Sequence, residues 1–189
     1  RSPAEPWQGP FGDRAAALRE LDAARRSLPE KPAQVWMLAR IGQAYARAGA
    51  VRQAAEMLTA AVPHVEPNNA QQQSEVHVLE GEIELARGQA ARAVERFDLA
   101  HRRHAWPLTL EPLARGEAAA RLDEKSLGHH RELVDLAHRC LGWEAQAPWL
   151  ASHYRLAKLL ADRGERDEAK QVLDRLLGFW KNGDRTATL

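Results

Sequence analysis

Apolar residues recur at helical spacing through most of the chain. One stripe runs from Leu38 to Tyr45, with an apolar residue every three or four positions, and a second runs from Ala54 to Ala61. This spacing places each set on one face of an α-helix. Gly49 lies between the two stripes, where a residue of left-handed conformation commonly ends a helix. The segment therefore predicts two amphipathic helices joined by a tight turn.

The same pattern returns further along the chain. Gly42 lies within the first stripe. A glycine inside a helix costs about 1 kcal/mol relative to alanine, so its presence needs a packing reason. We therefore expect a neighbouring helix to approach closely at this position. In the next unit Gly81 takes the place of Gly42, and Gly88 takes the place of Gly49, 39 positions later. Gly164 marks a turn of the same kind in the last unit. The chain is therefore a series of related helix pairs.

The third unit departs from this pattern. Gly116 is matched to the helix glycine of the earlier units, but no turn glycine follows in register. Gly164 lies 76 positions after Gly88, which is two steps of 38, so the missing turn is expected near Ser126. The polar segment 122–128 is accordingly interpreted as a longer loop.

These units resemble tetratricopeptide repeats, which are helix–turn–helix units of about 34 residues. The resemblance implies an all-α fold, a right-handed α-solenoid of about nine antiparallel helices, in which each helix pair packs on its neighbours. A half repeat at its start is expected to be one helix from about Asp13 to Leu28. The expected parts are an extended lead-in (1–11), a superhelix (12–181, with the half repeat at 12–29 and repeats at about 32–67, 68–105, 107–142 and 147–181) and a flexible tail (182–189).

The last 110 residues or so have a narrower resemblance. The segment from Leu141 to Trp149 and the helix end from Leu177 to Asp184 look like the C-terminal repeat regions of some bacterial signalling proteins, such as Ser/Thr kinases of the eukaryotic type. The repeats of large transcriptional activator ATPases are a looser match. This resemblance implies a sensor or docking module and brings no catalytic residue with it. Neither a kinase glycine loop nor a phosphate loop occurs in the sequence.

The charge balance narrows the range of partners. Charged residues make up 28% of the chain and the formal net charge is +1, which argues against a nucleic-acid partner and against a polybasic membrane patch. No apolar run approaches the roughly 18 residues of a membrane span, so no membrane insertion is expected. We expect a soluble protein. A cytoplasmic location is favoured, and a periplasmic one stays open.

The sequence offers little for catalysis or metal binding. There are eight histidines, but only His101 and His104 share a helix face in sequence, and no H-E-x-x-H or paired C-x-x-C motif occurs. Cys140 falls on an apolar stripe, which indicates a buried structural thiol. Trp106, Trp143 and Trp149 are placed in loops between units, as gap fillers or as anchors for a partner. We expect no metal, no cofactor and no enzyme activity.

In the tetratricopeptide family the inner groove is lined by the first helix of each repeat. The resemblance therefore implies a non-catalytic scaffold that holds a peptide or a partner protein in this groove. Two alternatives stay open, a small-molecule sensor or regulatory domain of a larger signalling protein and a structural subunit of a complex. Carried across in register, the groove residues are Trp36, Arg40, Gln43 and Arg47, then Glu75, Val78 and Glu82, then Leu113 and Glu117, and finally Tyr154, Arg155 and Lys158.

Overall fold

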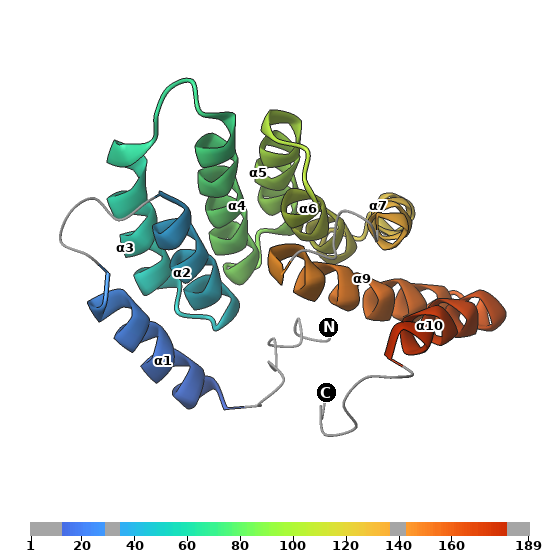
Figure 1. Ribbon diagram of the computed structural model, residues 1–189. Coiled ribbons are helices and arrows are strands. Elements are labelled where there is room, and N and C mark those ends of the chain that lie inside the picture. Colours follow the sequence, from blue (N-terminus) through green and yellow to red (C-terminus); the bar gives the residue numbers. More distant parts are fainter. Residues whose placement is uncertain (1–12, 29–34, 137–142, 181–189) are drawn as a thin grey trace. The chain divides into compact units, whose positions relative to one another are not determined.

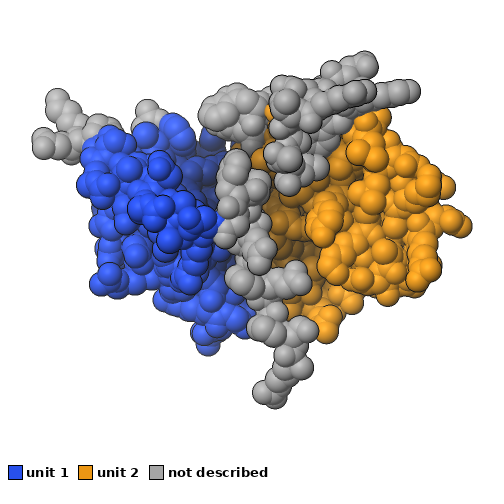
Figure 2. All heavy atoms as spheres, turned by 90° about the horizontal axis from the view of Figure 1, so that it is seen from below, with its two compact units in different colours: residues 1–105 blue, residues 106–189 orange. Residues whose placement is uncertain are grey.

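The structure, a computed structural model, describes residues 13–28, 35–136 and 143–180, without the side chains of 143–145 and 179–180. These residues form nine α-helices, one short 3₁₀ helix and no strand (Figure 1). The all-α prediction is therefore confirmed for the described part of the chain. None of these helices is both long enough and apolar enough to cross a bilayer. The chain divides into two compact units, residues 1–105 and 106–189, which are coloured separately in Figure 2.

Unit 1 contains a single helix followed by two helix pairs. The single helix is predicted from about Asp13, and Asp13 caps it by accepting a hydrogen bond from the backbone N–H of Ala16 at 2.9 Å. Asn69 caps a later helix in the same way, by accepting a hydrogen bond from the backbone N–H of Gln72 at 3.1 Å. The elements of this unit are α1 (Arg14–Arg26), α2 (Val35–Arg47), α3 (Val51–Ala61), η1 (Val62–His64), α4 (Ala70–Ala86) and α5 (Ala90–Arg103).

Close helix packing at the two helix glycines of unit 1 is confirmed. A Cβ on Gly81 would lie 2.4 Å from the ring of Phe97, and a Cβ on Gly42 would lie 2.8 Å from both terminal methyl groups of Leu79. Phe97 and Leu79 are themselves fully buried. Each glycine therefore leaves the space that a large core side chain fills, and this offsets its unfavourable helix propensity.

The described residues of unit 2 form two helix pairs, and one of them extends further than the sequence pattern indicated. Its helices are α6 (Pro107–Ala119), α7 (Asp123–Asp135), α9 (Trp143–Asp162) and α10 (Arg166–Trp180). The placement of Trp143 and Trp149 in a loop was wrong, because both lie in α9. The indole N–H of Trp149 donates to the backbone oxygen of Val134 at 3.1 Å, so this buried side chain helps to join α9 to α7.

The turn of the third repeat lies at Arg121, not near Ser126. Arg121 has a φ of 62°, close to the positive φ values of Gly49, Gly88 and Gly164. The backbone N–H of the following residue, Leu122, donates to a carbonyl oxygen five residues back at 2.8 Å, and the residue after each turn glycine makes the same bond at 2.8 or 2.9 Å. The expected loop over 122–128 is therefore almost entirely helix. The prediction failed because it required a glycine at a position that arginine can also occupy, at some conformational cost.

Placing the turn at Arg121 also shifts the register of the third repeat. Ala114, and not Gly116, then lies seven residues before the turn, where Gly42 lies in the first repeat. Ser126 lies five residues after the turn, where Ala54 lies in the first repeat. Ser126 is fully buried, and its hydroxyl donates to the backbone oxygen of Ala114 at 2.7 Å. A small residue therefore occupies both sides of the close helix contact in this repeat as well.

Some predictions fall outside the described residues. They concern the lead-in over 1–11, the tail over 182–189 and the surroundings of Cys140. The two compact units are divided after Ala105, and the repeat bounds stay a prediction.

Candidate partner-binding surface

The predicted groove residues of unit 1 lie on α2 and α4, which pack against each other, and we call these residues the α2–α4 surface. Its members are Trp36, Arg40, Gln43, Arg47, Glu75, Val78 and Glu82. The structure joins four of them in two ion pairs that cross from helix to helix. Arg40 contacts Glu75 at 3.1 Å, and Arg47 contacts Glu82 at 2.7 Å. The two residues of each pair are 35 positions apart, about one repeat, so ion pairs join the first helices of successive repeats.

The Arg47–Glu82 pair is the more deeply placed of the two. The side chain of Glu82 is only 2% exposed, whereas that of Arg47 is 36% exposed. The Nε and Nη2 atoms of Arg47 both donate to the same carboxylate oxygen of Glu82, at 2.9 and 2.7 Å. Because a buried carboxylate is costly without a partner, this pair supports the fold as well as the surface.

The remaining residues of the α2–α4 surface differ in exposure. Gln43 and Val78 are buried, and the side-chain amide nitrogen of Gln43 has no hydrogen-bond partner among the described residues. Trp36 is 43% exposed, which is high for a side chain of its size. Of this set, Trp36 is the large apolar side chain that an arriving molecule could reach.

In unit 2 the corresponding surface lies on α6 and α9, which also pack together. The α6–α9 surface consists of Glu111, Arg115, Tyr154, Arg155 and Lys158. Glu111 is buried and accepts a hydrogen bond from Arg155 of α9, and Arg115 lies 3.4 Å from the same carboxylate oxygen. An ion pair between first helices therefore recurs in unit 2.

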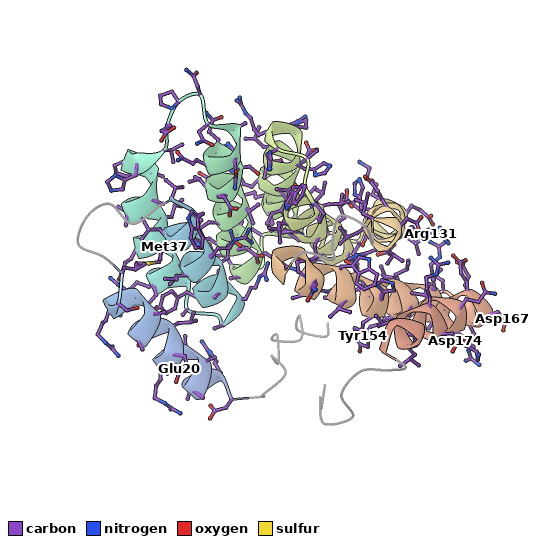
Figure 3. The ribbon with its side chains drawn as sticks, viewed as in Figure 1. Glu20, Met37, Arg131, Tyr154, Asp167 and Asp174 are labelled. Atoms are coloured by element: carbon purple, nitrogen blue, oxygen red, sulfur yellow. The ribbon has the colours of Figure 1, made fainter. Side chains whose placement is uncertain are left out.

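Tyr154 and Lys158 lie one turn apart on α9. Tyr154, labelled in Figure 3, is 64% exposed and is the most exposed large hydrophobic residue of the described chain. The Lys158 amine contacts the carboxylate of Asp162 at 3.0 Å, with both side chains more than half exposed. An exposed ion pair of this kind is weak, so Lys158 can exchange its partner at little cost.

The register shift of the third repeat corrects the two groove residues assigned to it. Leu113 is buried in the core of unit 2, and Glu117 is buried with its carboxylate 2.7 Å from the Nδ1 atom of His129. The residues at the matching positions are Glu111 and Arg115, which sequence reasoning missed. Counting back from Arg121 as the turn residue would have found both of them.

The described histidines do not converge. No group of three or more His, Cys, Asp or Glu side chains in the described ranges is placed to hold a metal ion. His130 Nδ1 lies 3.1 Å from Ser152 Oγ, a pairing that can activate a hydroxyl in hydrolases. Both residues are fully buried, however, so a substrate cannot reach this hydroxyl. The pair is a core contact between α7 and α9.

Burial also lowers the pKa of two of these histidines. It lowers the pKa of His130 to about 4, although the carboxylate of Glu111 acts in the opposite direction. Burial likewise lowers the pKa of His153, against a hydrogen bond to the backbone oxygen of Trp149. At neutral pH both imidazoles are therefore uncharged, and neither is available as a cationic contact for a partner.

Comparisons with solved structures identify proteins of similar fold. The structure matches the crystal structure of MamA with a TM-score of 0.57 at 15% sequence identity, over 91% of this chain and 95% of that chain. It matches the crystal structure of Podosopora anserina putative kinesin light chain nearly identical TPR-like repeats with a TM-score of 0.54 at 19% identity, over 92% of this chain and 88% of that chain. The fold is therefore a tetratricopeptide-like α-solenoid.

Comparisons of the sequence alone do not assign the chain to a protein family. No protein-family model matches the chain, and no curated protein matches it. The similarity is one of fold, since the sequence identity is 15% to the first of these solved structures and 19% to the second. The narrower resemblance to bacterial signalling proteins stays a prediction.

Proposed function

With the tetratricopeptide-like fold as premise, we propose that the protein is a non-catalytic interaction module. It binds a peptide or a partner protein on the first-helix surfaces of its units, the α2–α4 surface and the α6–α9 surface. The observation that carries this proposal is the exposure of one large aromatic side chain on each surface, Trp36 at 43% and Tyr154 at 64%. Aromatic side chains that become buried on binding supply much of the affinity of protein interfaces.

The ion pairs around these aromatic residues support the same proposal. Arg40 with Glu75 and Arg155 with Glu111 join neighbouring first helices of their own units. Side chains that are already held by partners lose little conformational freedom when a ligand arrives, so the surfaces are preorganised. The arginines thus form part of the fixed binding surface, and the aromatic side chains are the residues that become buried on binding.

Lys158 is the cation best placed to contact a partner directly. Its side chain is 56% exposed and its ion pair with Asp162 is exposed as well. An acidic side chain of the partner could replace Asp162 with little loss, because exposed pairs contribute less than about 1 kcal/mol. We therefore expect the partner segment to offer an apolar or aromatic residue to Tyr154 and an acidic residue to Lys158.

The experiment is affinity capture with wild-type protein, followed by measurement of binding to each purified captured partner by isothermal titration calorimetry. Trp36→Ala and Tyr154→Ala should each weaken binding to the partner of their surface by tenfold or more, which corresponds to at least about 1.4 kcal/mol. Val62→Ala is the matched control, because Val62 is 51% exposed but lies in η1 and belongs to neither set of surface residues. Urea denaturation of each variant verifies that its stability is unchanged.

Two results would overturn the proposal. One is wild-type affinity in the double variant Trp36→Ala/Tyr154→Ala for every captured partner. The other is a loss of affinity in Val62→Ala as large as that in the two aromatic variants, since binding would then lie elsewhere on the surface. A Lys158→Glu variant refines the picture, because it should weaken binding of an acidic segment and leave the fold intact.

A further inference from the structure

Two of the described histidines of unit 2 lie in its core. His130 of α7 and His153 of α9 are both fully buried, and the Nε2 atom of each has no hydrogen-bond partner among the described residues. The other ring nitrogen is bonded in each case, to Ser152 Oγ for His130 and to the Trp149 backbone oxygen, at 2.9 Å, for His153. A buried polar atom without a partner destabilises the folded state, so these imidazoles are unusual core residues.

The repeat just before each of these positions holds an apolar residue there. Counted from the turn residue, His130 lies where Phe97 lies in the preceding repeat, and His153 lies where Leu110 lies in the preceding repeat. Phe97 and Leu110 are both buried and apolar. The two histidines therefore stand at packing positions of the solenoid, and each adds one titratable group to the core.

The charges around His130 offer it no carboxylate of its own. Among the described residues, Glu111 of α6 is the acidic group that acts on it, and Glu111 already pairs with Arg155 of α9 and lies near Arg115 of α6. His129, on the same helix as His130, also disfavours its protonation. A proton on His130 would thus add a positive charge where arginines from two helices already neutralise the carboxylate.

His153 has a similar balance. It stacks edge-to-face on Trp149, with ring centroids 4.3 Å apart. From the helices packed against α9, Asp135 of α7 favours its protonated form and Arg175 of α10 disfavours it. These two side chains also face each other at 3.5 Å, so Asp135 is already paired with Arg175. Protonated His153 would therefore place a charge in the buried core, beside a carboxylate that is already paired.

We propose that unit 2 is an acid-sensitive module, in which protonation of His130 and His153 opens the packing of α7 against α9 while unit 1 keeps its fold. The sign follows from linkage. Both groups bind protons more readily in the unfolded than in the folded state. For His130 the stability is full above about pH 6.5 and is lost as the pH falls toward 4, and His153 adds a loss of the same sign. For His130 alone, the equilibrium constant for opening should rise on the order of tenfold at about pH 5.

Unit 1 provides the internal reference. None of its described histidines is buried: His64 is exposed, and His77, His101 and His104 are intermediate. His77 lies 2.9 Å from the carboxylate of Glu80. Of the described histidines, it is therefore two in unit 2, and none in unit 1, that place a titratable imidazole in a core. This inference goes beyond the proposed function, and its test requires no binding partner.

The test is hydrogen–deuterium exchange of the full chain at about pH 7.5 and about pH 5, corrected for the intrinsic pH dependence of exchange. Peptides from α7 and α9 should lose protection by tenfold or more at the lower pH, whereas peptides from α2 and α4 should keep theirs. The variant His130→Phe/His153→Leu, which restores the residue types of the neighbouring repeats, should abolish the difference. His64→Leu is the matched control and should behave as wild type.

Three outcomes would overturn the proposal: equal loss of protection in both units, no loss in α7 and α9, or an unchanged acid response in the double variant. If the double variant does not fold, imidazole NMR titration of the wild type decides. Signals of His130 and His153 that titrate near pH 6.5 in the folded protein contradict the proposal. Signals that stay neutral until unit 2 opens support it.

Discussion

Arg47 and Glu82 join neighbouring first helices of unit 1 through two hydrogen bonds from one guanidinium to one carboxylate oxygen, at 2.9 and 2.7 Å. The Glu82 side chain is almost fully buried, and the Arg47 side chain is about one-third exposed. The pair therefore holds α2 to α4, and Arg47 stabilises the surface from which the sequence predicted it would bind a partner.

The first prediction concerns this pair. We expect Arg47→Ala to lower the free energy of unfolding of unit 1 by about 2 kcal/mol, because Glu82 stays buried without this partner. Arg25→Ala is the control, since Arg25 contacts Glu56 at 2.7 Å with both side chains about 40% exposed, and its loss should be below about 1 kcal/mol. Urea denaturation measures both. Equal losses in the two variants would show that burial of Glu82 does not matter.

The second prediction concerns the helix glycines. Gly81→Ala should destabilise unit 1 by about 1–3 kcal/mol, because the new Cβ would overlap the buried ring of Phe97. The cost of this overlap is larger than the gain from the better helix propensity of alanine. Gly128→Ala is the matched control within α7, where nothing lies within 4 Å of the new Cβ. It should stabilise unit 2 by up to about 1 kcal/mol. Thermal and urea unfolding give both signs, and stabilisation by Gly81→Ala would refute the close contact.

The third prediction concerns the turn at Arg121. A side chain at a φ of 62° is unfavourable, so Arg121→Gly should raise the free energy of unfolding of unit 2 by up to about 1 kcal/mol. The reverse change is Gly88→Ala, where φ is +76° and there is open space around the new Cβ, and it should cost about 1 kcal/mol from conformation alone. Urea midpoints that move in the same direction for both variants would contradict the assigned backbone conformation.

The fourth prediction concerns the hydroxyl of Tyr45, which donates to a carboxylate oxygen of Asp22 at 2.6 Å. Burial, with Asp22 as the second cause, raises the pKa of Tyr45 to about 12. Because the folded-state pKa lies above the ordinary value near 10, this stabilisation is full below pH 10 and is lost as the pH rises toward 12. In the Tyr154→Phe variant Tyr45 is the one remaining tyrosine of the sequence, so its ultraviolet titration is read directly. A midpoint near 10 in folded protein would contradict the structure.

Much of the fold followed from the spacing of small and large residues. Gly42, Gly81 and the turn at Gly49 were placed correctly because each reflects a local requirement, either a close helix contact or a positive φ. The third turn was missed because arginine carries no sequence signal for a left-handed conformation. That single position moved the register of the repeat, and with it the groove residues Leu113 and Glu117.

The partners of the surface residues could not be predicted from the sequence. Arg40 and Glu75 are 35 positions apart, and their contact depends on how one hairpin packs on the next. The burial of His130 was likewise hidden, because histidine is common on surfaces and the misplaced turn concealed its equivalence to Phe97. Long-range packing decides both features, and a single sequence reports local preference more directly than it reports packing.

The four turns make the same backbone hydrogen bonds with three glycines and one arginine, so main-chain geometry is kept where the side chain is not. Searches for distant homologues that require a turn glycine would pass over the third repeat. A better signature is a pair of small residues twelve positions apart that brackets each turn. The chain has four such pairs, Gly42 with Ala54, Gly81 with Ala93, Ala114 with Ser126, and Ala157 with Ala169.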